Sequence, residues 1–340
     1  MVLVPRLMRE AVKASLVITL MLWGGQAFAR CTGTNLMAQM PKADLAKITA
    51  TAHAEPFATG LLWRAKRGKA EVIVAGTYHF DDPRHAKLVN LMIPELKGAA
   101  SLLVEAGPKE EARLQSEMAT RADLMFDPDG PTLPELLDEA DWKRLSKAFE
   151  ARGIPAIFAA KFKPWYASIL ISMSPCAMSE IAGGAVGLDK QLVAQAEAMN
   201  LPIRALEPYD TAFHLFDDVS EADQRDLLRG ALSAEGQADD MTATLAEAYF
   251  DGETRLIWTF SEWLSRQDDT LPPEVIEAQL KLSEDQLMVK RNRAWIPVIE
   301  AASAISAGKP VVVAAGALHL AGEGGVLNLL RQRGWVIEPF

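Results

Sequence analysis

The chain has 340 residues, of which 49% are hydrophobic and 24% are charged, and its formal net charge is −10. This composition is enough to bury a globular core, and no tract of low complexity interrupts it. The acidic balance argues against nucleic acid as a partner, because nucleic-acid binding needs a basic surface to neutralise phosphates. It is also a poor match to an anionic membrane surface.

Residues 1–29 have the pattern of a secretory signal peptide. A basic start is followed by the apolar run LVITLMLW at 16–23 and by an A-x-A cleavage site that ends at Ala29. The run is shorter than the ~20 residues that span a bilayer. We therefore expect a mature chain from Arg30, without a stable membrane anchor, that is periplasmic or secreted. Cleavage removes three basic residues and one acidic residue, which leaves a net charge of −12. The alternative is an uncleaved anchor.

The first elements of the mature chain are predicted from hydrophobic periodicity and turn residues. Their order is a helical segment at 31–52, two strands at 60–66 and 70–75 with a turn at 67–69, a helix that starts at 81–83, and a buried strand at 101–104. The second strand, the helix and the buried strand form a unit that implies parallel pairing with a right-handed crossover.

The middle of the chain is predicted to be mostly helical. A capping box at Thr132 and Glu135 predicts a helix that runs to Ala151, and a later helix is expected to begin near Lys163 and to end at Pro175. The remaining predicted elements are a helix at 190–199, a strand at 201–206, a helical region at 220–302 with a late helix at 287–299, a strand at 311–315, a helix at 325–333 and a terminal edge strand at 335–337.

These elements predict an α/β fold. Its central sheet would be mixed but mainly parallel and built from both ends of the chain, with a large helical insertion at about 108–305. We expect one domain over residues 30–340, since α/β folds of this length often form a single domain.

Two predicted strands end in the same short motif, a glycine followed three residues later by a histidine. The motifs are Gly76-Thr-Tyr-His79 and Gly316-Ala-Leu-His319, and Glu105 ends a third strand. In open α/β sheets, ligands bind just beyond the carboxyl ends of the strands. Two imidazoles and a carboxylate suit a divalent transition metal, which could lower the pKa of bound water and polarise a carbonyl group. A single histidine at a strand end is more often structural.

Other candidate residues have a functional and a structural interpretation. Glu207, at the end of a strand, is an active-site acid, a partner that holds a histidine tautomer, or an ordinary carboxylate. Arg291 and Asn292 could hold a substrate carbonyl or carboxylate, or lie on a solvated helix face. No H-E-x-x-H helix, G-x-S-x-G elbow, phosphate-binding loop or dinucleotide fingerprint is present.

Cys31 and Cys176 are the two cysteines of the chain, and both follow the predicted cleavage site. In an exported protein, two cysteines indicate one disulfide first. The alternative is a pair of free thiols.

Six motifs, in order along the chain, resemble the TraB/GumN family, which includes bacterial pheromone-shutdown and GumN-like proteins and the animal Tiki proteases. They are GTYHFDDP at 76–83, LLVEAGP at 102–108, GLDKQL at 187–192, ALEP at 205–208, KRNRAW at 290–295 and AAGALHLAGEGGVLNLLRQRGW at 314–335. The resemblance implies a core like that of the erythromycin-esterase and ChaN superfamily. The Tiki branch implies a peptidase that uses manganese or cobalt.

Carried over residue by residue, the resemblance implies metal or catalytic roles for His79, Glu105 and His319. Arg291 and Asn292 match another family motif, and Glu207 matches the acidic position after a strand.

The leading hypothesis is an exported, metal-dependent hydrolase, most plausibly a peptidase or amidase with a peptide or small-molecule substrate. His79, Glu105 and His319 would hold a Mn, Co, Fe or Zn ion, and Glu105 or Glu207 would be the general base. One alternative is a non-catalytic protein that binds a peptide or haem. Another is an esterase-like hydrolase in which one histidine acts as a base without metal.

Overall fold

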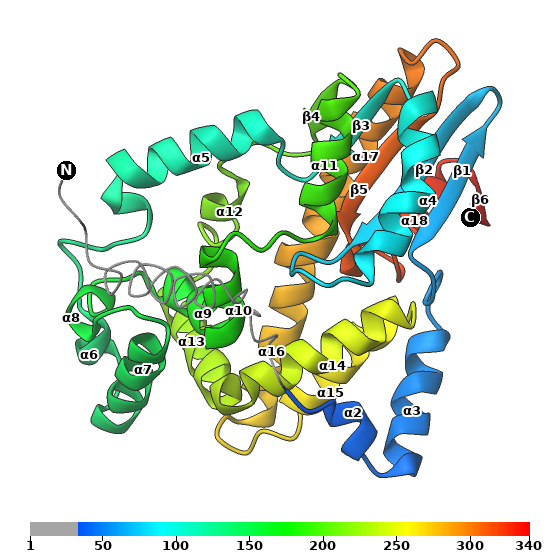
Figure 1. Cartoon of the computed structure of the whole chain (residues 1–340). Helices are drawn as coiled ribbons and strands as arrows, with labels where there is room; N and C mark the ends of the chain where they lie inside the picture. Colours follow the sequence, from blue (N-terminus) through cyan, green and yellow to red (C-terminus); the bar gives the residue numbers. More distant parts are fainter. Residues whose placement is uncertain (1–32) are drawn as a thin grey trace, which may run out of the picture. The chain divides into compact units, whose positions relative to one another are not determined.

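A computed structural model describes residues 33–340 (Figure 1). Residues 1–32 lie outside the described residues, so the cleavage site at Ala29 and the pairing of Cys31 with Cys176 stay predictions. The described residues belong to one compact unit. None of the helices within it combines the length and the apolar character needed to cross a membrane.

The centre of the fold is a sheet of six strands in the order β4-β3-β5-β2-β1-β6. Neighbouring strands from β4 to β2 run parallel, whereas β1 is antiparallel to both β2 and β6. This confirms the predicted mixed, mainly parallel sheet built from both chain ends. The strands are β1 (Leu62–Arg67), β2 (Ala70–Thr77), β3 (Ser101–Val104), β4 (Ile203–Ala205), β5 (Val311–Gly316) and β6 (Val336–Pro339).

Side-chain alternation along the central strands divides the core into two layers. On β2, Ile73 and Ala75 face one layer, and Val72 and Val74 face the other. Figure 1 shows helices α4 and α11 in front of the sheet and α17 behind it, and α18 packs in the same layer as α17. Because both faces are covered, β3 and β5 consist of continuously buried residues.

Helices from both ends of the chain and from the insertion contribute buried residues to the two layers of the core. They are α2 (Leu36–Gln39), α3 (Lys42–His53), α4 (His85–Gly98), α11 (Leu188–Ala198), α14 (Ala238–Phe250), α15 (Thr254–Ser265), α17 (Lys290–Ala304) and α18 (Val326–Gln332).

The remaining helices and helical turns lie mostly between β3 and α17 in the sequence. They are α5 (Pro108–Thr120), η1 (Ala122–Leu124), α6 (Leu133–Leu136), α7 (Glu139–Ala151), α8 (Ala156–Ala159), α9 (Pro164–Ser172), α10 (Pro175–Ala182), α12 (Thr211–His214), α13 (Glu221–Ala234), η2 (Glu235–Gln237), α16 (Pro273–Glu284), η3 (Asp285–Val289) and η4 (Ala317–His319).

The helical insertion has a hydrophobic core of its own. Leu145 and Phe149 of α7, Ile171 of α9 and Leu228 of α13 are fully buried in one cluster. Tyr249 of α14 instead packs in the layer that covers the sheet. The insertion is therefore anchored to the sheet as well as folded on itself.

Three helix boundaries differ from the prediction. The helix expected from Thr132 to Ala151 is split, because Leu137 is extended and Asp138 caps α7 through the backbone N–H of Asp141. Pro175 begins α10, since a proline is tolerated in the first helical turn. The late helix begins at residue 290, after the π-helical turn η3.

Candidate functional site

The two glycine–histidine motifs lie side by side at the carboxyl edge of the sheet. Strands β2 and β5 are parallel neighbours, and the register pairs Thr77 with Gly316. His79 and His319 therefore follow adjacent strand ends. The turn after β2 is held by the Tyr249 hydroxyl, which donates a hydrogen bond of 2.9 Å to the carbonyl oxygen of Gly76.

Three predicted site residues meet around Gly316. A Cβ atom on this glycine would lie 3.2 Å from Glu105 Oε1, 3.4 Å from His79 Nε2 and 3.5 Å from His319 Cδ2. The Gly316 backbone N–H also donates to Glu105 Oε1 at 2.7 Å. The absence of a side chain at this position therefore lets the three groups lie close to one another.

His319 is held in one orientation by its buried surroundings. Its Nδ1 lies 2.6 Å from Asn292 Oδ1, and Asn292 Nδ2 donates to the carbonyl oxygen of Gly324. Because the Asn292 oxygen can only accept, His319 Nδ1 carries the proton and Nε2 keeps its lone pair. The ring packs against Trp295, with 4.4 Å between the centroids.

His79 has a similar outer partner but more exposure. Its Nδ1 lies 3.3 Å from Asp189 Oδ1 at the start of α11, and its side chain is 57% exposed. A carboxylate on Nδ1 turns Nε2 toward Gly316, just as Asn292 orients Nε2 of His319. This arrangement is typical of histidines that bind metal ions.

Arg291 of α17 joins both predicted glutamates to this centre. Its Nη2 donates to Glu105 Oε2 at 2.6 Å and to Glu207 Oε1 at 2.7 Å, and its Nε donates to Glu207 Oε2 at 2.9 Å. Trp295 Nε1 also donates to Glu207. Arg291 Nη1 lies 3.2 Å from His319 Nε2. Both oxygens of Glu207 therefore take part in fixing the position of the Arg291 guanidinium.

These contacts move the pKa values of the two histidines in opposite directions. Burial lowers the pKa of His319 to about 4, so this ring is neutral at neutral pH. His79 is partly open to solvent but closely surrounded by protein atoms, and this desolvation also opposes its charged form. The hydrogen bond to Asp189 and the nearby Glu105 outweigh it and raise the pKa of His79 to about 9.

Glu105 stays ionised in this environment. Burial acts to raise the pKa of its carboxyl group, but His319, His79, Arg291 and the Gly316 amide outweigh burial and lower the pKa to about 2. The site therefore holds a persistent carboxylate beside a guanidinium.

The donor set suits a divalent ion in its chemistry, with two oriented imidazoles and one ionised carboxylate that converge at Gly316. The side chains as they stand do not form a closed metal cage. Across residues 33–340, no group of three or more His, Cys, Asp or Glu side chains is arranged to hold an ion. Within the site, Arg291 bonds to Glu105 Oε2 and faces His319 Nε2. An ion bound there requires Arg291 to move away from His319.

Two residues of the site were not identified from the sequence. Asp189 was part of a quoted motif but was given no role. Gly187 precedes it, and a Cβ there would lie 2.4 Å from the backbone of His79. This close approach lets the Leu188 N–H bond to the Tyr78 carbonyl oxygen at 2.9 Å. Gly187, the first residue of the GLDKQL motif, could have indicated this contact from the sequence, since glycine permits such a close approach between backbone segments.

Asn292 lies beside His319, on the buried side of α17. It is 1% exposed and contacts His319 and Gly324, so it orients a histidine and is not open to a substrate. A hollow of about 200 Å³ opens beside His79, Glu105 and Asp189.

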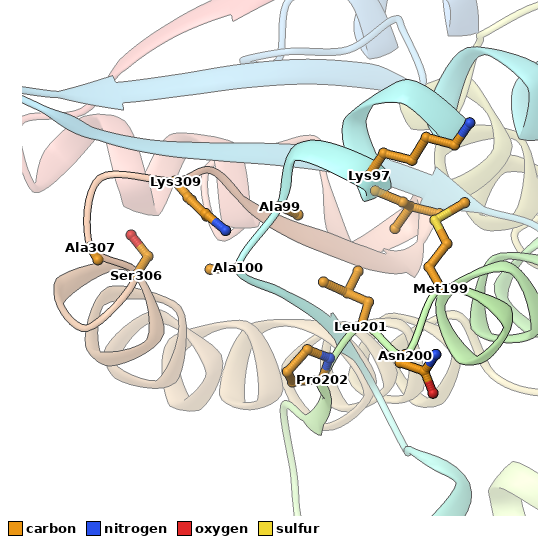
Figure 2. A pocket seen from close by; sticks show the side chains of 11 residues that line it. Lys97, Ala99, Ala100, Met199, Asn200, Leu201, Pro202, Ser306, Ala307 and Lys309 are labelled. Carbon is orange, nitrogen blue, oxygen red and sulfur yellow. The ribbon is translucent and has the colours of Figure 1, made fainter.

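A second hollow lies at the opposite edge of the sheet, at the amino ends of β3, β4 and β5 (Figure 2). It is bounded by the loops at 99–100, 199–202 and 306–309, and none of the predicted site residues lines it. The candidate site therefore belongs to the carboxyl edge alone.

Comparison with known families agrees with the motifs. A sequence model of the TraB/PrgY/gumN family matches residues 61–339. The match runs from the residue before β1 to the last residue of β6, so it includes the whole sheet and every residue of the candidate site. A search of curated proteins found no significant match.

Proposed function

The chain belongs to the TraB/PrgY/gumN family, and on this premise we propose that it is a metal-dependent hydrolase that cleaves a peptide or a small amide. The observation that carries the proposal is the convergence of His79 Nε2, the Glu105 carboxylate and the His319 ring around Gly316. The outer partners of both histidines support it, because each holds its ring with Nε2 turned toward the site. Ion binding there would release the His79 proton and displace Arg291 from His319 Nε2.

The ion would be Mn, Co, Fe or Zn, held by His79, Glu105 and His319, and it would lower the pKa of a water molecule and polarise the carbonyl group to be cleaved. Arg291 Nη1 would turn from His319 Nε2 and donate to the carbonyl oxygen as negative charge develops there.

We assign different roles to Glu207 and Glu105. Glu207 is a positioning residue, because it accepts hydrogen bonds from Arg291 and Trp295 and, unlike Glu105, does not line the hollow beside His79. Glu105 borders the open hollow, so we assign to it the proton that leaves the attacking water.

Hydrolysis of a synthetic peptide mixture, with and without a chelator, tests the proposal. We expect activity to be lost in EDTA and restored by one of the four metals, and His79→Ala or His319→Ala to lower kcat/KM by at least ~100-fold. His214→Ala is the matched control, because His214 pairs with Asp217 on the exposed part of α12, away from the site. Hydrolysis that persists in His79→Ala would rule the proposal out.

A hydrolase without metal is the second candidate. The observations in its favour are the His79–Asp189 pair, which has the geometry of a base oriented by a carboxylate, and the guanidinium beside His319 Nε2. Activity that is unchanged in EDTA, yet lost in Asp189→Asn, would select this candidate over the metal enzyme.

We also propose export to the periplasm or beyond the cell, on the sequence pattern of residues 1–29. The intact mass of the exported chain is expected to correspond to a first residue of Arg30. Recovery of the full-length chain only from the cytoplasm would contradict this part of the proposal.

A further inference from the structure

The hollow beside the candidate site lies on the face of the sheet that α11 covers. Val104, Ala314 and Val193 form its apolar wall, and His79 and Glu105 border it on the side of the proposed reaction centre. Its volume of about 200 Å³ is below the ~300–1,000 Å³ of a typical small-molecule site. The hollow therefore suits one group of a larger substrate.

Thr77 is the one uncharged polar residue, apart from His79, among those that line this hollow. It is the last residue of β2, it is 3% exposed, and its Oγ1 has no hydrogen-bond partner within the described part of the chain. The neighbouring buried groups Asn292 and His319 are bonded to each other. A buried hydroxyl without a partner is unfavourable. Because Thr77 lines the hollow, a group bound there supplies the missing partner once the hydroxyl turns toward it.

The outer end of the hollow is bordered by charged residues that bond to each other. Lys190 of α11 forms an ion pair with Glu111 of α5, and both residues line the hollow. This pair joins the two helices and limits how long a group can enter without displacing it. The volume of the hollow and this ion pair together favour a short side chain as its occupant.

We propose that this hollow is a substrate subsite that binds one short side chain with a hydrogen-bonding end, such as threonine or asparagine, through the Thr77 hydroxyl. The inference rests on the proposed hydrolase function and adds its substrate preference. An apolar side chain of equal size enters the hollow equally well but leaves the Thr77 hydroxyl unpaired. The subsite therefore distinguishes polar from apolar side chains by the hydrogen bond that the apolar ones cannot form, and not by their size.

A set of hexapeptides Ala-Ala-Xaa-Ala-Ala-Ala, with Xaa as Thr, Val, Asn or Leu, tests the subsite. The wild-type protein is expected to prefer Thr over Val and Asn over Leu by roughly tenfold in kcat/KM. The isosteric Thr77→Val should reduce both ratios to about one, and Thr77→Ser should keep them. Val193→Phe, which fills the hollow from α11, should lower kcat/KM for all four peptides relative to the peptide with Xaa as Gly.

Ser303→Ala is the matched control, because Ser303 is also buried and its hydroxyl also lacks a partner among the described residues, but it lies outside the hollow. The control should keep the wild-type ratios. Ratios near one in the wild-type protein, or full ratios in Thr77→Val, would overturn the subsite.

Binding measurements separate this inference from the proposed function. If no hexapeptide is cleaved, hydrolysis fails as the function, and calorimetric binding of the same peptides then tests the subsite. A roughly tenfold preference in Kd that disappears in Thr77→Val supports the subsite, and equal Kd values overturn it. If Thr77→Val fails to fold, as judged by its melting temperature, the Thr77→Ser and Val193→Phe variants decide the outcome.

Discussion

At the scale of single residues, Gly316 determines how closely the side chains of the candidate site can approach one another. Its missing side chain leaves the space toward which Glu105 Oε1, His79 Nε2 and the His319 ring converge, and its N–H holds Glu105 at 2.7 Å. The backbone at this position does not need a positive φ, so the glycine is required for space and not for conformation.

Gly316→Ala should therefore impair the site more than the fold. The added methyl group would lie within 3.5 Å of all three groups, and we expect kcat/KM to fall at least ~10-fold with a loss of about 1–2 kcal/mol in the free energy of unfolding. Gly98→Ala, at the end of α4 with open space around it, is the control and should leave activity unchanged. Equal activity in the two variants would contradict this role of Gly316 in the site.

In the proposed metal site, Asp189 would strengthen metal binding indirectly, by orienting the His79 ring. Asp189→Asn should weaken metal binding by about 10- to 100-fold in Kd, because an outer carboxylate orients its histidine and raises its basicity. The measurement is calorimetric titration of metal into metal-free protein. Asp217→Asn removes the same kind of partner from the exposed His214 and should change nothing. An unchanged Kd in Asp189→Asn would show that Asp189 has no such role.

At the scale of elements, the positions of the strands could be predicted from the sequence, whereas the helix boundaries in the insertion were predicted less accurately. Runs such as Val311–Gly316 are buried on both faces and end in a turn, so periodicity and glycine locate them. The break between α6 and α7 depends on Asp138, whose side chain competes with the helix by capping the next one. Thr132 and Asp138 are both suitable N-cap residues and lie only six positions apart. The spacing of hydrophobic residues does not show whether one helix or two will form there.

Helix α17 is tied to the antiparallel end of the sheet by Glu300. Its carboxylate accepts from Arg67 of β1 at 2.6 Å, from Arg333 at 2.9 Å and from Trp335, and the side chain is 15% exposed. The Arg333 hydrogen bond is the main cause that lowers the pKa of Glu300. A lowered pKa stabilises the folded protein above the unfolded pKa of ~4.3, and this stabilisation is lost as pH falls through the folded pKa.

Glu300→Gln should therefore lower the free energy of unfolding by about 1–2 kcal/mol at pH 7. The difference from wild type should shrink below a pH of ~4. Denaturant titrations over this pH range measure it, with Glu150→Gln on the exposed end of α7 as the control. A difference that does not depend on pH would contradict the role of the charged carboxylate.

At the scale of the whole molecule, the site is assembled from parts that are remote in sequence. His79, Glu105 and His319 were predicted because each follows a strand, and a parallel sheet brings its carboxyl ends to one edge. The partners of Arg291 could not be predicted, since Glu207 and Glu105 lie 84 and 186 positions away and no local pattern links them. Asp189 was missed because the position of α11 depends on the fold of the insertion.

The family match over residues 61–339 agrees with this assembly, since it includes both ends of the sheet. The predicted disulfide would add a covalent link from the start of the mature chain to α10 at Cys176. Its other half, Cys31, lies outside the described residues, so the link stays a prediction.

The most direct test of the account is the metal content of the purified mature protein, measured by elemental analysis. We predict about one Mn, Co, Fe or Zn ion per chain in the wild type and in His214→Ala, and none in the His79→Ala, His319→Ala double variant. A wild-type protein that neither carries nor takes up any of these metals, or a double variant with the same metal content, would contradict the central claim.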